Sequence, residues 1–188
     1  AAEVVAAMEL RDAVVTSVNR DDLDDGGAAI FAQTVDRIRD LVPNCDVEVL
    51  IPDFKGSEEA LKIVMDARPE ILNHNVETVP RLYKQARPGA DYQWSLELLQ
   101  KFKQVQPEVP TKSGIMLGLG ETRAQVEQAL RDLRAHDVDM ITLGQYLRPS
   151  PMHIPVARWV TPDEFAEWKR TGEALGFLHD DHRLAVVE

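Results

Sequence analysis

Apolar and polar positions follow one another in blocks, and each block has the period of a helix or of a buried strand. In residues 28–41 apolar side chains recur every three or four positions, which predicts an amphipathic helix with one face in the core. Short apolar runs at residues 13–18 and 47–51 are typical of buried strands. The same criteria predict strands at 70–76, 110–117 and 139–143 and helices at 1–10, 79–86, 95–105 and 161–175. Two further helices are predicted to begin at the capping residues Ser57 and Thr122, and Thr161 is predicted to cap the last helix.

Strands and helices therefore alternate along the chain, which predicts an α/β fold of parallel strands joined by right-handed crossovers. The length of 188 residues suits one domain, and no linker or low-complexity tract divides it. A complete eight-stranded barrel usually needs about 250 residues. We therefore expect residues 1–188 to form a single domain that is either a smaller barrel or part of one.

Charge and cysteine content exclude several classes of protein. The net charge is -11, and no basic stripe is present, so we expect no nucleic-acid partner. No apolar run approaches the roughly 20 residues of a membrane span, so we expect no membrane association either. Cys45 is the single cysteine, which favours a reducing, cytoplasmic location and a structural thiol.

Polar side chains cluster where the predicted strands end. Because the carboxyl ends of parallel strands meet at one edge, we expect these groups to form a ligand-binding rim. The alternative is that asparagines such as Asn73 and Asn75 only satisfy loop backbone groups. The predicted rim consists of Thr16, Ser17, Asn19, Asp53, Asn73, Asn75, Glu77, Lys112, Gln145, Tyr146 and Arg148.

Other groups carry weaker signals. The acidic loop at residues 21–25 lacks the spacing of a calcium loop, so we interpret it as solvated or helix-capping. Lys112 has the character of a Schiff-base lysine, but pairing with Glu77 or another rim carboxylate explains it as well. The histidines and aspartates at residues 179–182 are interpreted as a solvated tail, and we predict no metal ligands in the chain.

Six motifs occur in order along the chain: VTSVNRDDL at 15–23 with DGG at 25–27, EVLIPDF at 48–54, LNHNVETVPRLY at 72–83, RPGADY at 87–92, KSGIMLGLGE at 112–121 and GQYLRPS at 144–150. Together they resemble one family, the lipoyl synthases of the radical S-adenosylmethionine (SAM) superfamily. The likeness runs from Ala13 to Phe177. Gly118 belongs to a glycine motif that resembles the superfamily's adenine-side motif, with Met116 where isoleucine is usual.

This resemblance implies a partial (β/α)6 barrel of the radical SAM type, lacking its first strand. It also implies SAM and two [4Fe–4S] clusters as cofactors, and insertion of two sulfur atoms into a protein-bound octanoyl group to form lipoyl. The implied partner is an octanoylated lipoyl carrier domain or H protein. The residues we assign to SAM on this basis are Ser17, Asn19, Asn75, Glu77, Lys112, Gly118, Tyr146 and Arg148.

The chain also departs from the family pattern. Members carry a C-x3-C-x2-C triplet for the SAM cluster and a second, N-terminal triplet, and neither occurs here. The atypical tail at 178–188 lacks the family's cluster-ligating serine. We therefore interpret the chain as a fragment that alone is inactive. The alternatives are a non-catalytic module that binds SAM or the lipoyl carrier, and a cofactor-free lyase that uses Lys112.

Overall fold

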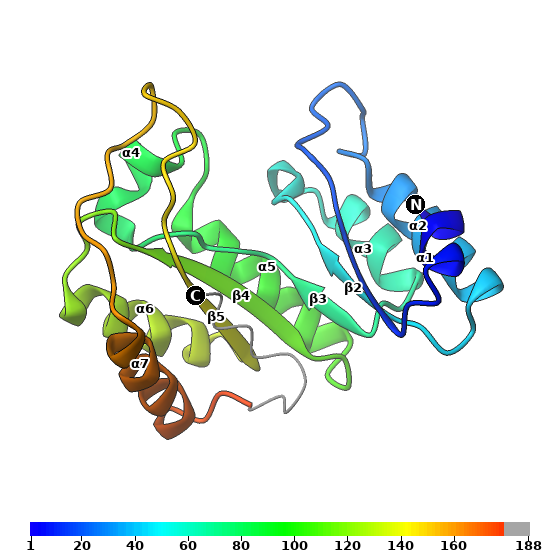
Figure 1. The fold of residues 1–188 in the computed structure, drawn as a ribbon. Coiled ribbons are helices and arrows are strands. Elements are labelled where there is room, and N and C mark those ends of the chain that lie inside the picture. Colours follow the sequence, from blue (N-terminus) through cyan, green and yellow to red (C-terminus); the bar gives the residue numbers. More distant parts are fainter. Residues whose placement is uncertain (179–188) are drawn as a thin grey trace. The chain divides into compact units, whose positions relative to one another are not determined.

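A computed structural model of the chain describes residues 1–178 (Figure 1). The elements occur in the predicted α/β alternation. Their bounds are α1 (Ala2–Ala7), β1 (Asp12–Thr16), α2 (Ala28–Leu41), β2 (Asp46–Leu50), η1 (Phe54–Gly56), α3 (Glu58–Asp66), β3 (Ile71–Asn73), η2 (Pro80–Leu82), α4 (Tyr83–Ala86), α5 (Tyr92–Val105), β4 (Thr111–Leu117), α6 (Arg123–Ala135), β5 (Met140–Gln145) and α7 (Pro162–Ala174).

The chain divides into two compact units. The first unit contains Ala1–His74 and Lys101–Thr111, and the second contains Asn75–Gln100 and the chain from Lys112 onward. The sequence-based expectation of a single domain stays a prediction.

The first unit is built on a parallel ladder in the order β1–β2–β3. On one side, α2 packs against α3, and α1 contacts α2 (Figure 1). The helix α2 buries Phe31, Val35 and Ile38, as its periodicity predicts, and β2 buries Val47 and Val49. This core fixes the carboxyl ends of β1 and β2 next to each other.

The second unit is built on the parallel pair β4–β5. The helix α6 begins with a capping box, in which Thr122 accepts a hydrogen bond from the Gln125 amide and the Gln125 side chain accepts one from Thr122. The predicted cap of α7 is also confirmed, because Thr161 accepts a hydrogen bond from Glu164 N. Both helices therefore begin where the sequence predicts.

The strand β3 is shorter than predicted. It ends at Asn73 instead of Val76, and the chain then makes one isolated parallel bridge, between Glu77 and Ile115. Glu77 has a φ of 64°, which is incompatible with an extended strand. The run of polar residues after Asn73 is therefore a loop whose backbone groups need other partners.

Candidate functional site

The two faces of the β4–β5 pair differ in character. One face is packed, and α7 covers part of it with Gly172 close to Ile141 (Figure 1). On the other face a side-chain carbon built on Gly144 would meet no described heavy atom within 4 Å. The packed face carries Ser113, Ile115, Leu117, Ile141 and Leu143, and the open face carries Lys112, Gly114, Met116, Thr142 and Gly144. The small residues on the open face leave room for a ligand.

Asn75 and Glu77 lie directly against β4. A side-chain carbon on Gly114 would lie 2.6 Å from Oδ1 of Asn75, so the Asn75 amide occupies the space above this glycine. The Glu77 amide donates to the Gly114 carbonyl (2.8 Å), and the Met116 amide donates to the Glu77 carbonyl (2.8 Å). Two of the predicted SAM ligands are thus brought together at the open face.

The electrostatics of Glu77 are unusual for a surface carboxylate. Burial raises the pKa of Glu77, while a hydrogen bond from Asn75 and the positive charge of Arg87 lower it. The neighbouring Thr78 hydroxyl is buried and has no hydrogen-bond partner among the described residues. A half-buried carboxylate that accepts a hydrogen bond from a neighbouring amide is suited to a ligand that carries hydroxyl or amino groups.

The loop after β4 is closed by its own carboxylate. Gly118 and Gly120 have φ of 100° and 103°, which favour glycine. The buried Glu121 accepts hydrogen bonds from the amides of Gly118 (2.7 Å) and Leu119 (2.9 Å). These amides are therefore used within the loop, and the assignment of Gly118 to SAM stays a prediction.

Tyr146 and Arg148 hold the segment that follows β5. The Tyr146 hydroxyl donates to the Ile154 carbonyl (2.9 Å), and Arg148 donates to the carbonyls of Pro151 and His153. Both residues thus have structural partners on one loop. Their assignment to SAM stays a prediction.

The expectation that Lys112 lies at the carboxyl end of its strand is wrong. Lys112 is the second residue of β4 and pairs with Met140, the first residue of β5. At about 3.3 Å per residue, this position is about 16 Å from Leu117 at the other end of the strand. The predicted strand at 110–117 already places Lys112 near its amino end, so the assignment of Lys112 to the rim rested on its polar character alone. The SAM and Schiff-base roles of Lys112 stay predictions.

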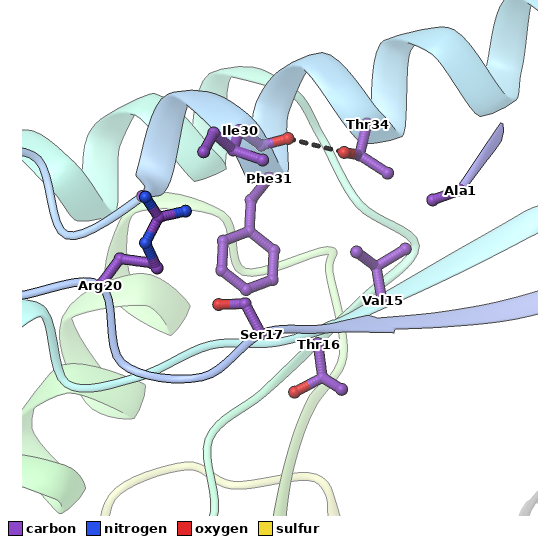
Figure 2. A pocket seen from close by; sticks show the side chains of 9 residues that line it. Ala1, Val15, Thr16, Ser17, Arg20, Ile30, Phe31 and Thr34 are labelled. Atoms are coloured by element: carbon purple, nitrogen blue, oxygen red, sulfur yellow. Dashed lines mark hydrogen bonds between the residues drawn. The ribbon is translucent and has the colours of Figure 1, made fainter. Parts of the chain in front are cut away.

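In the first unit, Ser17 and Thr16 point to opposite sides of β1 (Figure 2). Ser17 points toward Phe31 of α2 in a small, mostly apolar pocket of about 210 Å³, and its hydroxyl donates to the Val18 carbonyl (2.9 Å). The strand register and the alternation of side chains along each strand place Thr16 on the other face of the ladder, together with Glu48 and Asn73. The assignment of Ser17 to SAM stays a prediction.

The sequence-based assignment missed Glu48. This carboxylate is buried in β2 and accepts a hydrogen bond from Asn73 Nδ2 (2.8 Å), while Asn73 Oδ1 has no hydrogen-bond partner among the described residues. A charged residue between two buried valines, Val47 and Val49, was the available signal, since a carboxylate inside a strand needs a polar partner.

The acidic loop of the first unit serves mainly to order the chain. Asp25 caps α2 by accepting from the amides of Gly27 (2.9 Å) and Ala29 (2.8 Å), which confirms the capping interpretation. Lys55 pairs with Asp21 (3.1 Å) across a polar pocket of about 440 Å³, which Asn19 also lines. Within residues 1–178 no group of three potential metal ligands is present.

The histidines and aspartates at 179–182, and the tail to residue 188, lie outside the described residues. No helix within residues 1–178 combines the length and the apolar character that crossing a membrane requires.

Comparison with known proteins identifies the class to which this fold and site belong. The radical SAM superfamily profile matches residues 1–133, and the chain belongs to this superfamily. Its sequence is similar to lipoyl synthases: it is 56% identical to that of Cronobacter sakazakii over 179 residues and 55% identical to that of Bordetella pertussis. These alignments cover 95% of this chain and 56% and 54% of the relatives, so the chain spans about half the length of the curated relatives it matches.

A solved structure supports the fold independently of close sequence similarity. Methylornithine synthase superposes with a TM-score of 0.72 at 14% identity, covering 92% of this chain and 52% of the other. The predicted fold class, a partial barrel of the radical SAM type, is thereby confirmed.

The residues present do not fit an iron–sulfur cluster. Such clusters are held by several cysteine thiolates, and these 188 residues contain only Cys45, which is buried. The open face of β4–β5 does fit SAM, since it combines free space at Gly144 with the polar groups of Asn75 and Glu77.

Proposed function

We propose that this protein is part of a lipoyl synthase and that its 188 residues supply the SAM-binding body. The observation that carries the proposal is the 55–56% identity to lipoyl synthases over 95% of the chain. The reaction is insertion of two sulfur atoms into a protein-bound octanoyl group, and the partner is an octanoylated lipoyl carrier domain or H protein, in the cytoplasm.

Asn75 and Glu77 are the residues that we expect to bind the ribose or the amino-acid part of SAM. A carboxylate and an amide at hydrogen-bonding distance of each other accept from and donate to hydroxyl and amino groups. Met116 and Gly144 offer an apolar, open surface to the adenine ring. When bound beside a reduced cluster, SAM supplies radical chemistry, whereas these side chains orient it and exclude water.

Calorimetric titration with SAM tests the binding role. We expect saturable binding by the wild-type chain and a loss of affinity of about tenfold or more in Glu77→Gln, because ionic hydrogen bonds to a ligand are strong. Glu97→Gln is the matched control, since Glu97 is exposed on α5 of the same unit and accepts a hydrogen bond from the exposed Gln93 side chain. Absence of SAM binding by the wild type contradicts the proposal.

The cluster test follows from the cysteine content. After anaerobic reconstitution, we expect the 188-residue chain to hold no stoichiometric [4Fe–4S] cluster and to form no lipoyl group on an octanoylated carrier domain, as measured by iron analysis and mass spectrometry. A stoichiometric cluster contradicts the interpretation that its ligands lie outside these residues.

A second candidate function is a non-catalytic module that binds SAM or the lipoyl carrier. The single buried cysteine favours it, because the chain retains the site without cluster ligands. The intact mass of the protein from its source separates the two candidates. A mass well above 21.1 kDa supports the lipoyl synthase, and a mass of that size supports the binding module.

A further inference from the structure

The backbone of the Asn75–Glu77 segment is held by side chains of one short helix. The Tyr83 hydroxyl donates to the Val76 carbonyl (2.7 Å), and Nη1 of Arg87 donates to the Asn75 carbonyl (3.0 Å). Tyr83 begins α4 and Arg87 caps its end. Because β3 ends at Asn73, these bonds satisfy carbonyl groups that a longer strand would pair in a ladder.

The two side chains also fix each other. Arg87 donates to the Tyr83 hydroxyl (3.3 Å), and its guanidinium lies 5.6 Å from the centre of the Tyr83 ring. The Tyr83 ring is buried and packs edge-to-face against Tyr92, with 5.3 Å between ring centres. The side chains that contact residues 75 and 76 are therefore themselves held in place by packing and by a hydrogen bond.

Charge gives the same arrangement a second role. Within residues 1–178, two titratable side chains face Glu77, Tyr83 of α4 and Arg87 at the end of that helix. The residues of β4 that bond to the Glu77 backbone, Gly114 and Met116, are not titratable. Burial raises the pKa of Glu77, and the Arg87 charge opposes this effect. Arg87 is thus the cation that favours the ionised form of this carboxyl.

We propose that Tyr83 and Arg87 are positioning residues, which hold Asn75 and Glu77 in the orientation that binds SAM and place a positive charge beside Glu77. The inference rests on the proposed function, since it assumes that Asn75 and Glu77 contact SAM. This role requires no contact of either residue with the ligand. They act through the carbonyls of Asn75 and Val76 and through the charge of Glu77.

Three variants of the chain test this role: Arg87→Gln, Arg87→Lys and Tyr83→Phe. SAM affinity is measured by calorimetry over a pH series, and the pKa of Glu77 is measured by NMR of carboxyl-labelled glutamate. Arg87→Gln should raise the Glu77 pKa, move the pH profile of SAM binding upward and weaken binding about tenfold near neutral pH. Arg87→Lys should keep the wild-type Glu77 pKa and pH profile, because it retains the charge.

Tyr83→Phe should weaken SAM binding with little change in the pH profile, because it removes a hydroxyl but no charge. Lys84→Gln is the control, since it removes an exposed positive charge from the same helix. It should change neither the SAM affinity nor the pH profile of binding. A change in melting temperature without any shift of the pH profile in Arg87→Gln means a merely structural role and overturns the inference.

Different results would contradict SAM binding by the chain and the positioning role of Tyr83 and Arg87. If the wild type does not bind SAM, the proposed function is wrong, and the positioning role falls with it. If the wild type binds SAM and Arg87→Gln binds with the same affinity and pH profile, the proposed function stands and the positioning role alone is wrong.

Discussion

A side-chain carbon on residue 114 would lie 2.6 Å from Oδ1 of Asn75, so the two residues fit together only because position 114 is glycine. The fit places the Asn75 amide on the open face of β4. It also explains why a glycine, which weakens most strands, stands in the middle of this one.

Gly114→Ala should therefore displace Asn75. We expect a loss of about 1–3 kcal/mol in the free energy of unfolding, because the added carbon overpacks the contact, and a clear loss of SAM affinity. Gly144→Ala is the stability control, since its added carbon meets no described atom within 4 Å. Urea denaturation of both variants measures the difference. Equal stabilities of the two variants contradict the packing argument.

Comparison of Gly118 with Gly120 distinguishes the stability cost of a strained φ from the cost of a steric clash. Both have φ near 100°, but a carbon on Gly118 would lie 2.6 Å from the Arg158 carbonyl oxygen, whereas one on Gly120 would lie 3.7 Å from the Ala157 side chain. Gly120→Ala should cost about 1 kcal/mol for its strained φ, and Gly118→Ala should cost at least about 1 kcal/mol more. Thermal melting of the two variants checks this, and the reverse order refutes it.

Glu121→Gln should destabilise the loop after β4. The carboxylate accepts from the amides of Gly118 and Leu119, and a glutamine would place an NH₂ group against one of these donors. We expect a loss of about 1–3 kcal/mol. Glu167→Gln, in an exposed pair with Arg123, should change stability by less than about 1 kcal/mol. Chemical denaturation compares the two, and similar losses argue against the loop bonds as the cause.

The raised pKa of Glu77 predicts a pH dependence of stability. Because the folded protein binds this proton more tightly than the unfolded chain does, the stabilisation is fully present below the ordinary pKa of 4.5 and is lost as pH rises through the folded pKa. Glu77→Gln should therefore become more stable relative to the wild type as pH rises through this range. Urea denaturation at pH values on both sides of 4.5 measures the trend, and a constant difference contradicts it.

The amino-acid sequence by itself determined the order of elements, the helix caps and the family. Periodicity in residues 28–41 and the caps Ser57, Thr122 and Thr161 are local signals, because apolar spacing and capping depend on residues within a few positions of each other. The start of α5 was predicted at residue 95 instead of Tyr92, because Asp91 was not recognised as accepting from Trp94 N.

Tertiary structure alone decided which polar residues share a face. The end of β3 at Asn73 and the burial of Glu48 depend on how the strands pair, which non-local packing sets. The contacts from Tyr83 and Arg87 to the carbonyls of residues 75 and 76 likewise exist only once α4 folds back. Sequence patterns thus identified the residue types of the proposed site, whereas three-dimensional packing brought Asn75 and Glu77 together against β4.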